Sequence, residues 1–387
     1  MSTPDKFSEI RPYDEGEVQE AIKELLADRQ FRHVLKAQVP FLPLCLTTGL
    51  IRLLTLGIKS PTQLQKRLMR PIVNYARRKT TDGVTFQGTP LPPTDGNYLF
   101  LSNHRDIVLD SAFLSILLLN AGHSTTCEIA IGDNLLIHPW IRTFVRLNKA
   151  FIVRRSLSPR EMFKSSQLMS EYIHYAIVKK PDNVWIAQRE GRAKDSNDRT
   201  QEAVLKMLAM GGDLRELNIV PLAISYEYDP CDYLKAAEFQ LKRDNPAWRK
   251  STKDDLTSMA TGIMGQKGRV AYHAAPCINA WLDEYAELPP AQFYEAVAKR
   301  IDRDIHRRYC LFPGNYVALD LLEGTRTHAD HYTPADEERF TAYLAGRLAK
   351  IDIPDKDEPY LRERILTMYA NPVRNHLAAC KPDAVRS

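Results

Sequence analysis

The sequence predicts an α/β protein whose mixed central sheet is flanked by helices and continued at both ends by helical segments. From about residue 84, short apolar runs alternate with helical stretches, which is typical of a layered α/β domain. The regions before and after this stretch show helical patterns instead. In a chain of 387 residues with ordinary composition, 44% hydrophobic and 26% charged, we expect an N-terminal helical region over 1–82, a main domain over 83–310 and a mostly helical extension over 311–387.

Six apolar runs have the length and residue content of buried strands, and helical patterns lie between them. The expected strands are 97–102, 127–131, 150–153, 184–187, 219–225 and 269–273. The expected helices are 109–120, 158–178, 203–210 and 291–308, followed by 334–350 and 359–370 in the extension. In such a domain the reactive residues are expected at strand ends.

The N-terminal region predicts contact with a surface rather than a spanning helix. Residues 1–29 are charged and lack the apolar core of a signal peptide, and the apolar stretch 39–58 is interrupted by Pro40, Pro43, Gly49 and Arg52. Residues 59–79 mix basic and apolar side chains, as expected of a helix at an anionic membrane face. The alternative is a solvated helix packed on the domain.

Charge and cysteine content set broad limits. The net charge of +5 allows an anionic partner but is too small to indicate nucleic acid, which we do not expect as a partner. The six cysteines lie far apart without paired short spacings, which argues against a zinc module or a disulfide scaffold and favours a reducing compartment. We expect no metal site and no cofactor.

The richest chemistry follows the first strong strand, where an imidazole and two carboxylates precede a helix. His104 is a candidate general base, and Asp110 is a candidate to hold its tautomer and stabilise the imidazolium. On its own, a histidine near an aspartate at a helix start is more often part of a cap than a catalytic pair.

Three further segments add binding groups. One strand runs through Phe151 and ends in two arginines, of which Arg154 has the fork that suits a phosphate. Another strand leads into Glu190, Gly191 and Arg192, where the glycine permits close approach of a ligand. The apolar run 219–224 contains Pro221, which by residue type alone predicts an edge or strand-start position.

Together and in this order, the four segments resemble the glycerolipid acyltransferase family, which includes the glycerol-3-phosphate and 1-acylglycerol-3-phosphate acyltransferases. The resemblance spans roughly residues 84–226. The positions that match the family's motifs are Asn103, His104, Asp110, Phe151, Ile152, Arg154, Glu190, Gly191 and Pro221.

Two positions depart from the family pattern. Five residues separate His104 from Asp110 where the usual motif has four, so Asp110 is favoured as the displaced aspartate and Asp106 is the less favoured alternative. Arg192 stands where the family usually has Thr or Gly, which leaves the phosphate contact open between Arg192 and Lys194.

The resemblance implies transfer of a fatty acyl group from acyl-CoA or acyl carrier protein to a glycerol phosphate or lysolipid. It implies His104 and Asp110 as catalytic residues, with Asn103, Phe151, Arg154, Glu190, Gly191, Arg192 and Pro221 binding substrate. An amphiphilic substrate strengthens the expectation of an anionic membrane surface as partner, and of peripheral attachment at the cytoplasmic face of a membrane. The alternatives are a different acceptor, such as another lysolipid or an amino-acid lipid, and a non-catalytic lipid-binding protein. A serine hydrolase is disfavoured because no Gly-x-Ser-x-Gly elbow is present.

Overall fold

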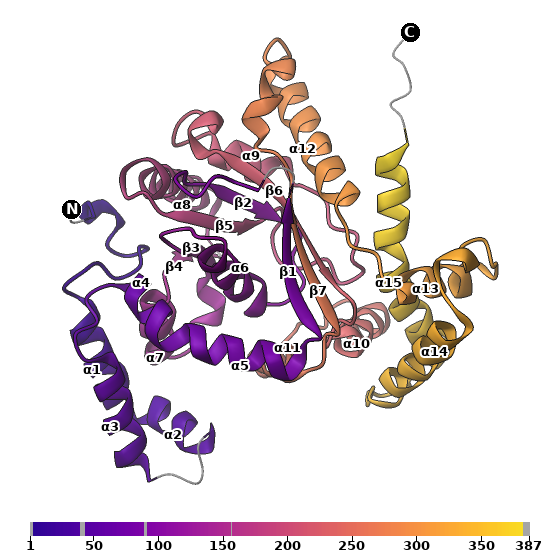
Figure 1. Ribbon diagram of the computed structural model, residues 1–387, viewed down its shortest axis with the longest axis horizontal. Helices are drawn as coiled ribbons and strands as arrows, with labels where there is room; N and C mark the ends of the chain where they lie inside the picture. Colours follow the sequence, from indigo (N-terminus) through magenta and orange to yellow (C-terminus); the bar gives the residue numbers. More distant parts are fainter. Residues whose placement is uncertain (1–2, 39–42, 89–90, 156, 382–387) are drawn as a thin grey trace.

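A seven-stranded sheet forms the centre of the protein (Figure 1). The structure is a computed structural model that describes residues 3–38, 43–88, 91–155 and 157–381. The strands are β1 (Gly83–Gly88), β2 (Leu99–Ser102), β3 (Cys127–Gly132), β4 (Ala150–Val153), β5 (Asn183–Ala187), β6 (Ile219–Tyr226) and β7 (Arg269–Ala274), in the spatial order β1-β7-β6-β2-β5-β3-β4. The strands from β6 to β4 run parallel, β7 is antiparallel to β6, and β1 is parallel to β7. The expected mixed sheet is confirmed.

Helices cover both faces of this sheet and form additions at both ends of the chain. They are α1 (Val18–Ala27), α2 (Arg29–Gln38), α3 (Leu44–Thr55), α4 (Pro61–Leu64), α5 (Arg70–Thr80), α6 (Leu109–Asn120), α7 (Pro139–Leu147), α8 (Pro159–His174), α9 (Glu202–Leu208), α10 (Asp232–Asp244), α11 (Thr252–Met264), α12 (Pro290–Arg307), α13 (Pro313–Glu323), α14 (Pro334–Ala349) and α15 (Glu358–Cys380). One face of the sheet packs against α5, α6 and α11, and the other packs against α8, α9 and α12.

The alternation of side chains along β2 and β5 divides the core between the two faces. Leu99 and Leu101 face the layer of α8, α9 and α12, whereas Phe100 faces α6. On β5, Trp185 points to the α6 side. All four residues of β2 are buried, as expected for a strand in the middle of a parallel sheet.

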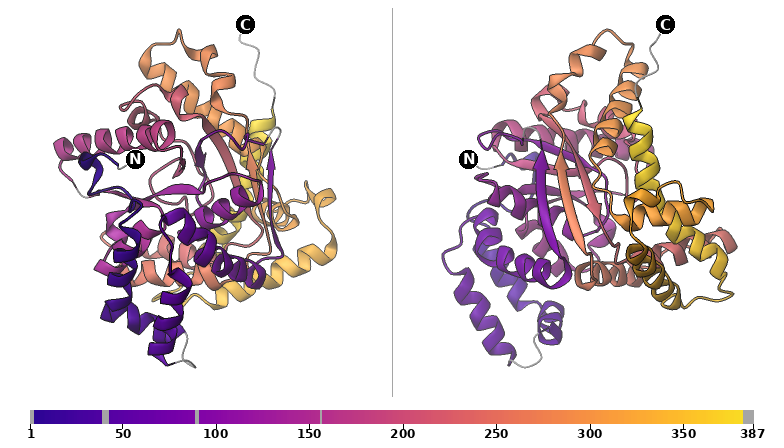
Figure 2. Two further views of the ribbon diagram at one scale, coloured as in Figure 1. Left: turned by 60° about the vertical axis from the view of Figure 1, so that its left-hand side comes forward. Right: turned by 45° about the vertical axis from the view of Figure 1, so that its right-hand side comes forward.

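The N-terminal and C-terminal helices lie on opposite sides of the sheet, as both views of Figure 2 also show. The C-terminal helices α13, α14 and α15 share a hydrophobic cluster that includes Ala236 of α10. Within the described part of the chain, no helix has both the length and the apolar character needed to cross a membrane.

All six expected strands are present, with ends shifted by no more than two residues. The strand β1 was not predicted; it is an edge strand in which half-buried residues alternate with the exposed polar residues Thr85 and Gln87. The last helix is longer than the expected 359–370, because α15 continues through Pro372 to Cys380 and buries Val373, Asn375 and Ala379.

The basic segment 59–79 is helical but not one regular helix. It contains α4, a π-helical turn (Gln65–Met69) and α5, which has Pro71 in its first turn. A proline in a helix removes one backbone donor, and the π-helical turn, a rare element in proteins, lies directly before Pro71. Of the apolar stretch 39–58, residues 39–42 lie outside the described residues, and most of the remainder forms α3.

Candidate active site

His104 and Asp110 form a hydrogen-bonded pair at the carboxyl end of β2. His104 Nδ1 lies 2.7 Å from Asp110 Oδ2, and the Asp110 side chain is fully buried while that of His104 is 14% exposed. Because a carboxylate accepts at Nδ1, the proton of the neutral ring is on Nδ1, and Nε2 is left as the basic nitrogen. The ring packs edge-on against Trp185, with 5.2 Å between the ring centroids.

Asp106 and Asp110 have different roles in the loop that precedes α6. The Oδ1 atom of Asp106 accepts hydrogen bonds from the backbone N–H groups of Val108 and Leu109, at 2.9 and 2.8 Å, so this carboxylate caps the first turn. Asp110 Oδ2 instead accepts from the backbone N–H groups of Arg105 and Asp106 in addition to His104. The geometry thus pairs His104 with Asp110, across the longer spacing.

Burial and the charge of Asp110 raise the pKa of the Asp106 carboxyl above its ordinary value, although its two backbone hydrogen bonds and Arg192 oppose the change. The Asp106 carboxylate that caps the helix therefore lies next to the carboxylate of Asp110. Among the described residues, no cation lies within hydrogen-bond distance of Asp106. The backbone hydrogen bonds that the two carboxylates accept hold the loop that carries His104.

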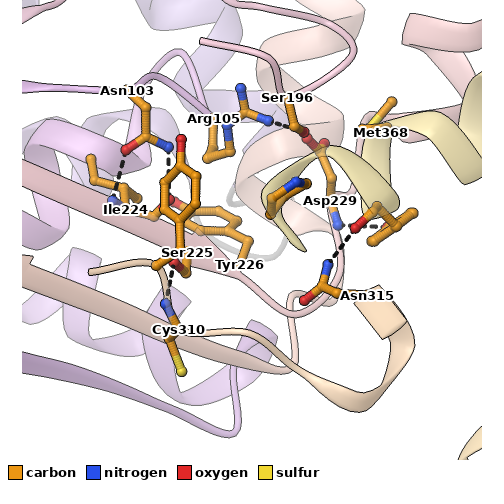
Figure 3. A pocket seen from close by; sticks show the side chains of 13 residues that line it. Asn103, Arg105, Ser196, Ile224, Ser225, Tyr226, Asp229, Cys310, Asn315 and Met368 are labelled. Atoms are coloured by element: carbon orange, nitrogen blue, oxygen red, sulfur yellow. Dashed lines mark hydrogen bonds between the residues drawn. The ribbon is translucent and has the colours of Figure 1, made fainter. Parts of the chain in front are cut away.

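Asn103 fastens the end of β2 to β6. Its side-chain amide donates to the carbonyl oxygen of Ile224 and its carbonyl oxygen accepts from the Ile224 N–H, both at 2.8 Å (Figure 3). Asn103 is 2% exposed. The Asn103 side chain thus holds the loop of His104 in place, and its expected role as a substrate ligand remains a prediction.

The arginines after β4 and the turn after β5 meet at the same edge of the sheet. Arg155 Nη1 lies 3.5 Å from Glu190 Oε1, whereas the Arg154 side chain points to Glu9 and forms an ion pair with it. Gly191 has a φ of +66°, a left-handed conformation that favours glycine. The structure therefore brings Glu190 together with Arg155 rather than with Arg154.

Arg192 lines a cavity of about 250 Å³ that is closed by elements outside the four motifs. Its Nη1 atom is buried and has no hydrogen-bond partner in the described residues. Lys194 lines the same cavity, but it forms an ion pair with Glu238 of α10. The other walls are formed by α10, α11 and the connection from α14 to α15, and they include Trp248, Lys350, Ile351 and Ile353.

Two expected substrate ligands lie in the core. Phe151 is fully buried and packs against Tyr172, with 5.5 Å between the ring centroids. Pro221 lies inside β6, in register with Leu101, just before the β6–β7 pairs begin at Leu222. Since Pro221 lies beyond the end of the β6–β7 ladder, its missing N–H removes none of these pairs, and the position is not an edge strand. Their contact with substrate remains a prediction.

Arg105, which the sequence analysis did not single out, connects the loop of His104 to the loop after β5. Its buried guanidinium donates to the hydroxyl of Ser196 (Figure 3). It also donates to the carbonyl oxygen of Ala193 at 3.0 Å and to the carboxylate of Asp198. Burial is the largest single influence and opposes the charge, but the combined effect of Asp198, Asp229, Tyr309 and Asp110 raises the pKa of Arg105.

Helices α12 and α15 hold this second loop from the other side. Asn371 donates to the carbonyl oxygen of Asp195 at 2.8 Å, and Arg199 donates to the side-chain oxygen of Asn375 at 2.8 Å. His306 of α12 contacts the carbonyl oxygen of Asp198. Between these contacts and the first motif lies a small cavity of about 40 Å³, whose lining Figure 3 shows.

Arg105, Arg155 and the α15 asparagines are the site residues that sequence reasoning missed. A buried arginine next to the candidate histidine carries no local signal that distinguishes it from a surface arginine. Arg155 is the second of the two arginines at the end of its strand. Alternation along a strand predicts that Arg154 and Arg155 point to opposite sides, but it does not show which of them faces the site.

The candidate site lies in a stretch that matches a known protein family. Residues 83–225 match the family model described as acyltransferase. Among solved structures, the chain is similar to the 1-acyl-sn-glycerophosphate acyltransferase PlsC from Thermotoga maritima, with 13% identity, coverage of 73% of this chain and 95% of that chain, and a TM-score of 0.39. No curated protein matches the sequence. The stretch from β1 to β6 is therefore an acyltransferase domain, and the expected enzyme class is confirmed.

Proposed function

We propose that this chain moves a fatty acyl group from acyl-CoA or an acyl carrier protein to a hydroxyl of a glycerol phosphate acceptor, either glycerol-3-phosphate or 1-acylglycerol-3-phosphate. The observation that carries the proposal is the pair of His104 and Asp110, with Nδ1 bound to a buried carboxylate and Nε2 available as base. The pair lies at the carboxyl ends of the parallel strands, the edge of the sheet that also carries the cation Arg155 and the turn of Glu190 and Gly191.

In the proposed reaction, Nε2 of His104 takes the proton of the acceptor hydroxyl while that oxygen attacks the thioester carbonyl carbon. Asp110 stabilises the imidazolium that forms, because its carboxylate is already hydrogen-bonded to Nδ1. The tetrahedral intermediate then collapses, the carbon–sulfur bond breaks, and the thiolate takes the proton from the imidazolium. The products are the ester and a free thiol, and His104 returns to its neutral form.

Arg192 is the proposed ligand of the acceptor phosphate. Its buried Nη1 has no partner in the described residues, whereas the competing candidate Lys194 already pairs with Glu238. A guanidinium donor that lines a cavity without a carboxylate partner is suited to a phosphate oxygen. Arg155, only 3.5 Å from Glu190, is a second cation at the same edge.

The proposed site of action is an anionic membrane surface, with peripheral attachment at its cytoplasmic face. Residues 29–81 contain eleven Lys or Arg and no Asp or Glu, so the rest of the chain carries a net charge of −6. Along α3, four leucines at helical spacing, Leu46, Leu50, Leu53 and Leu54, are each at least half exposed. An apolar face in a segment that carries only cations is the arrangement of an interfacial helix.

The catalytic proposal is tested by release of thiol from a long-chain acyl thioester in detergent. Glycerol-3-phosphate, 1-acylglycerol-3-phosphate and no acceptor are compared for the wild type and for His104→Ala, with His33→Ala as a matched control in exposed α2. We expect acceptor-dependent release that falls by at least about a hundredfold in His104→Ala, the size of a general-base contribution, and that is unchanged in His33→Ala. Acceptor-independent release indicates a thioesterase, and no release from a folded protein contradicts the proposal for these acceptors.

The membrane proposal is tested by sedimentation with vesicles of phosphatidylcholine, with and without phosphatidylglycerol. We expect binding that needs the anionic lipid, weakens with salt, and falls in the variant Leu50→Asp/Leu53→Asp. The matched control is Leu377→Asp, at an exposed leucine of α15. If both variants lose vesicle binding equally, or if binding does not depend on lipid charge, the proposal of attachment through α3 is wrong.

A further inference from the structure

One oxygen of the catalytic carboxylate has no partner, and a buried hydroxyl nearby also lacks one. Asp110 Oδ2 accepts from His104, from the Arg105 N–H at 2.6 Å and from the Asp106 N–H at 3.0 Å. Asp110 Oδ1 is buried without a hydrogen bond in the described residues, and so is the hydroxyl of Tyr226. A buried polar group without a hydrogen bond costs free energy, so two such atoms near each other indicate that they interact.

The sheet directs Tyr226 toward the first turn of α6. Tyr226 is the last residue of β6, and Figure 3 shows it beside Ile224 and Ser225 on the strand that holds Asn103. The register pairs Ile224 with Tyr272 and Tyr226 with Val270, so the two tyrosines are diagonal neighbours on one face. Tyr272 donates its hydroxyl to the backbone oxygen of Asp110 at 2.8 Å, which fixes this face of the sheet against Asp110.

Tyr226 is also kept in the form that can donate. Burial, Tyr272 and the charge of Asp110 raise the pKa of its hydroxyl well above the ordinary value. The group is therefore a neutral phenol at any working pH, and its proton is available to an oxygen that carries negative charge.

We infer that Tyr226 is a positioning residue of the acyl transfer, and that its hydroxyl donates to Oδ1 of Asp110, the carboxylate oxygen that His104 does not use. The inference rests on the proposed function for its role in catalysis, but the hydrogen bond itself does not depend on that function. Tyr226 acts through Asp110 and does not touch the reacting atoms. With both oxygens held, the carboxylate keeps the orientation that places Nε2 of His104 toward the acceptor.

Removing this donor changes the pH dependence in a definite direction. The pair of His104 and Asp110 has a net charge of −1 when the ring is neutral and zero when it is protonated. A hydrogen bond to the carboxylate stabilises the −1 state, so its loss favours the protonated ring. The acidic side of the pH–rate profile, where protonation of the base stops the reaction, is then expected at higher pH.

Other charged and titratable groups around the pair remain in place when only the hydroxyl is removed. Those that face Asp110 or its neighbour Asp106 from the packed elements are Arg105, Arg192, Tyr272 and Lys267. None of these side chains is altered in Tyr226→Phe, which removes one oxygen atom and retains the ring. A change in pH dependence is thus attributable to the hydrogen bond.

The test compares kcat and the acceptor KM across pH for the wild type, Tyr226→Phe and Tyr272→Phe. For Tyr226→Phe we expect kcat to fall about tenfold, the size of one hydrogen bond to a charged group, with KM unchanged. The acidic limb is expected to move up by about one pH unit, which corresponds to the same factor. Tyr272→Phe removes a donor to the backbone rather than to the carboxylate, and its profile is expected to stay at the wild-type position.

Replacing Tyr226 with 3-fluorotyrosine provides the opposite perturbation in a protein that keeps the hydroxyl. The more acidic phenol is a stronger donor, so the acidic limb is expected to move to lower pH. The titration of the His104 ring, followed by NMR on isotope-labelled histidine, is expected to move the same way in each variant and needs no activity. If the wild type is inactive but the His104 titration still shifts in the variants, only the proposed function is overturned. Wild-type titration in Tyr226→Phe, or an equal shift in Tyr272→Phe, overturns the inference.

Discussion

Replacement of Arg105 by methionine is expected to be among the most damaging single changes near the site. Methionine fills similar space but removes every donor that Arg105 gives to the second loop, namely those to Ala193, Ser196 and Asp198. The two charged side chains are 7% and 0% exposed, so water does not replace the lost contacts. The carboxylate of Asp198 is then left as a buried charge without its cation.

The magnitude follows from that uncompensated charge. Removing one partner of a buried ion pair typically costs about 3 to 5 kcal/mol, which is a large part of the roughly 5 to 15 kcal/mol that stabilises a folded protein. Removing both charges at once, in Arg105→Met/Asp198→Leu, avoids the unpaired carboxylate. The double variant is therefore expected to be more stable than Arg105→Met alone, although it carries one more substitution.

Urea unfolding monitored by circular dichroism measures the free energy of unfolding of the two variants and the wild type. The same samples are assayed for acyl transfer, where we expect both variants to lose activity because the loop after β5 is no longer fastened to the loop of His104. If the double variant is less stable than Arg105→Met, or if Arg105→Met costs less than about 1 kcal/mol, the buried pair does not hold the two loops as described.

Two further predictions concern Gly262 of α11, the helix that packs against the loop of His104, and Lys267, which follows this helix. A Cβ at Gly262 of α11 would collide with Asp106 Oδ2, so Gly262→Ala is expected to lower the thermal midpoint and kcat by displacing the cap of α6, at a cost of about 1 to 3 kcal/mol. In contrast, Gly346→Ala in α14, where a Cβ meets nothing within 4 Å, is expected to be neutral or stabilising. Burial lowers the pKa of Lys267 to about 8, below the ordinary value of 10.5, so between these pH values the unfolded chain binds more protons and stability rises with pH. Lys267→Met is expected to remove this part of the rise, and urea unfolding at pH 7.5 and about pH 10 checks it; a variant with the same slope as the wild type would show that Lys267 is not the source.

The sequence was sufficient for the parts of the fold that rest on local pattern. Buried strands such as β2 and β6 consist of apolar residues throughout, and α6 begins and ends as expected. The edge strand β1 has no such run, because it pairs only with β7 and keeps one side partly exposed. Its pairing depends on β7, almost 190 residues later in the chain, which no local pattern can show.

The same distinction separates the parts of the site that were predicted from those that were not. His104 and Asp110 lie within one loop and turn, so their pairing was inferable from spacing and resemblance. The sequence favoured Asp110 over Asp106, and the hydrogen bonds agree, because Asp110 pairs with His104 while Asp106 caps the helix. The contacts of Arg105 with Asp198 and of Asn375 with Arg199 join residues more than ninety positions apart.

The contacts between α15 and the loop after β5 affect which part of the chain is needed for activity. The stretch that carries the family's motifs ends at β6, yet Asn371 and Asn375, which fasten the loop leading away from Glu190 and Gly191, come about 150 residues later. A fragment cut to the matched stretch would retain every motif and lose the contacts that shape one of them. We therefore expect the smallest active fragment of this chain to extend to α15, and substitutions in that helix to change the reaction rate.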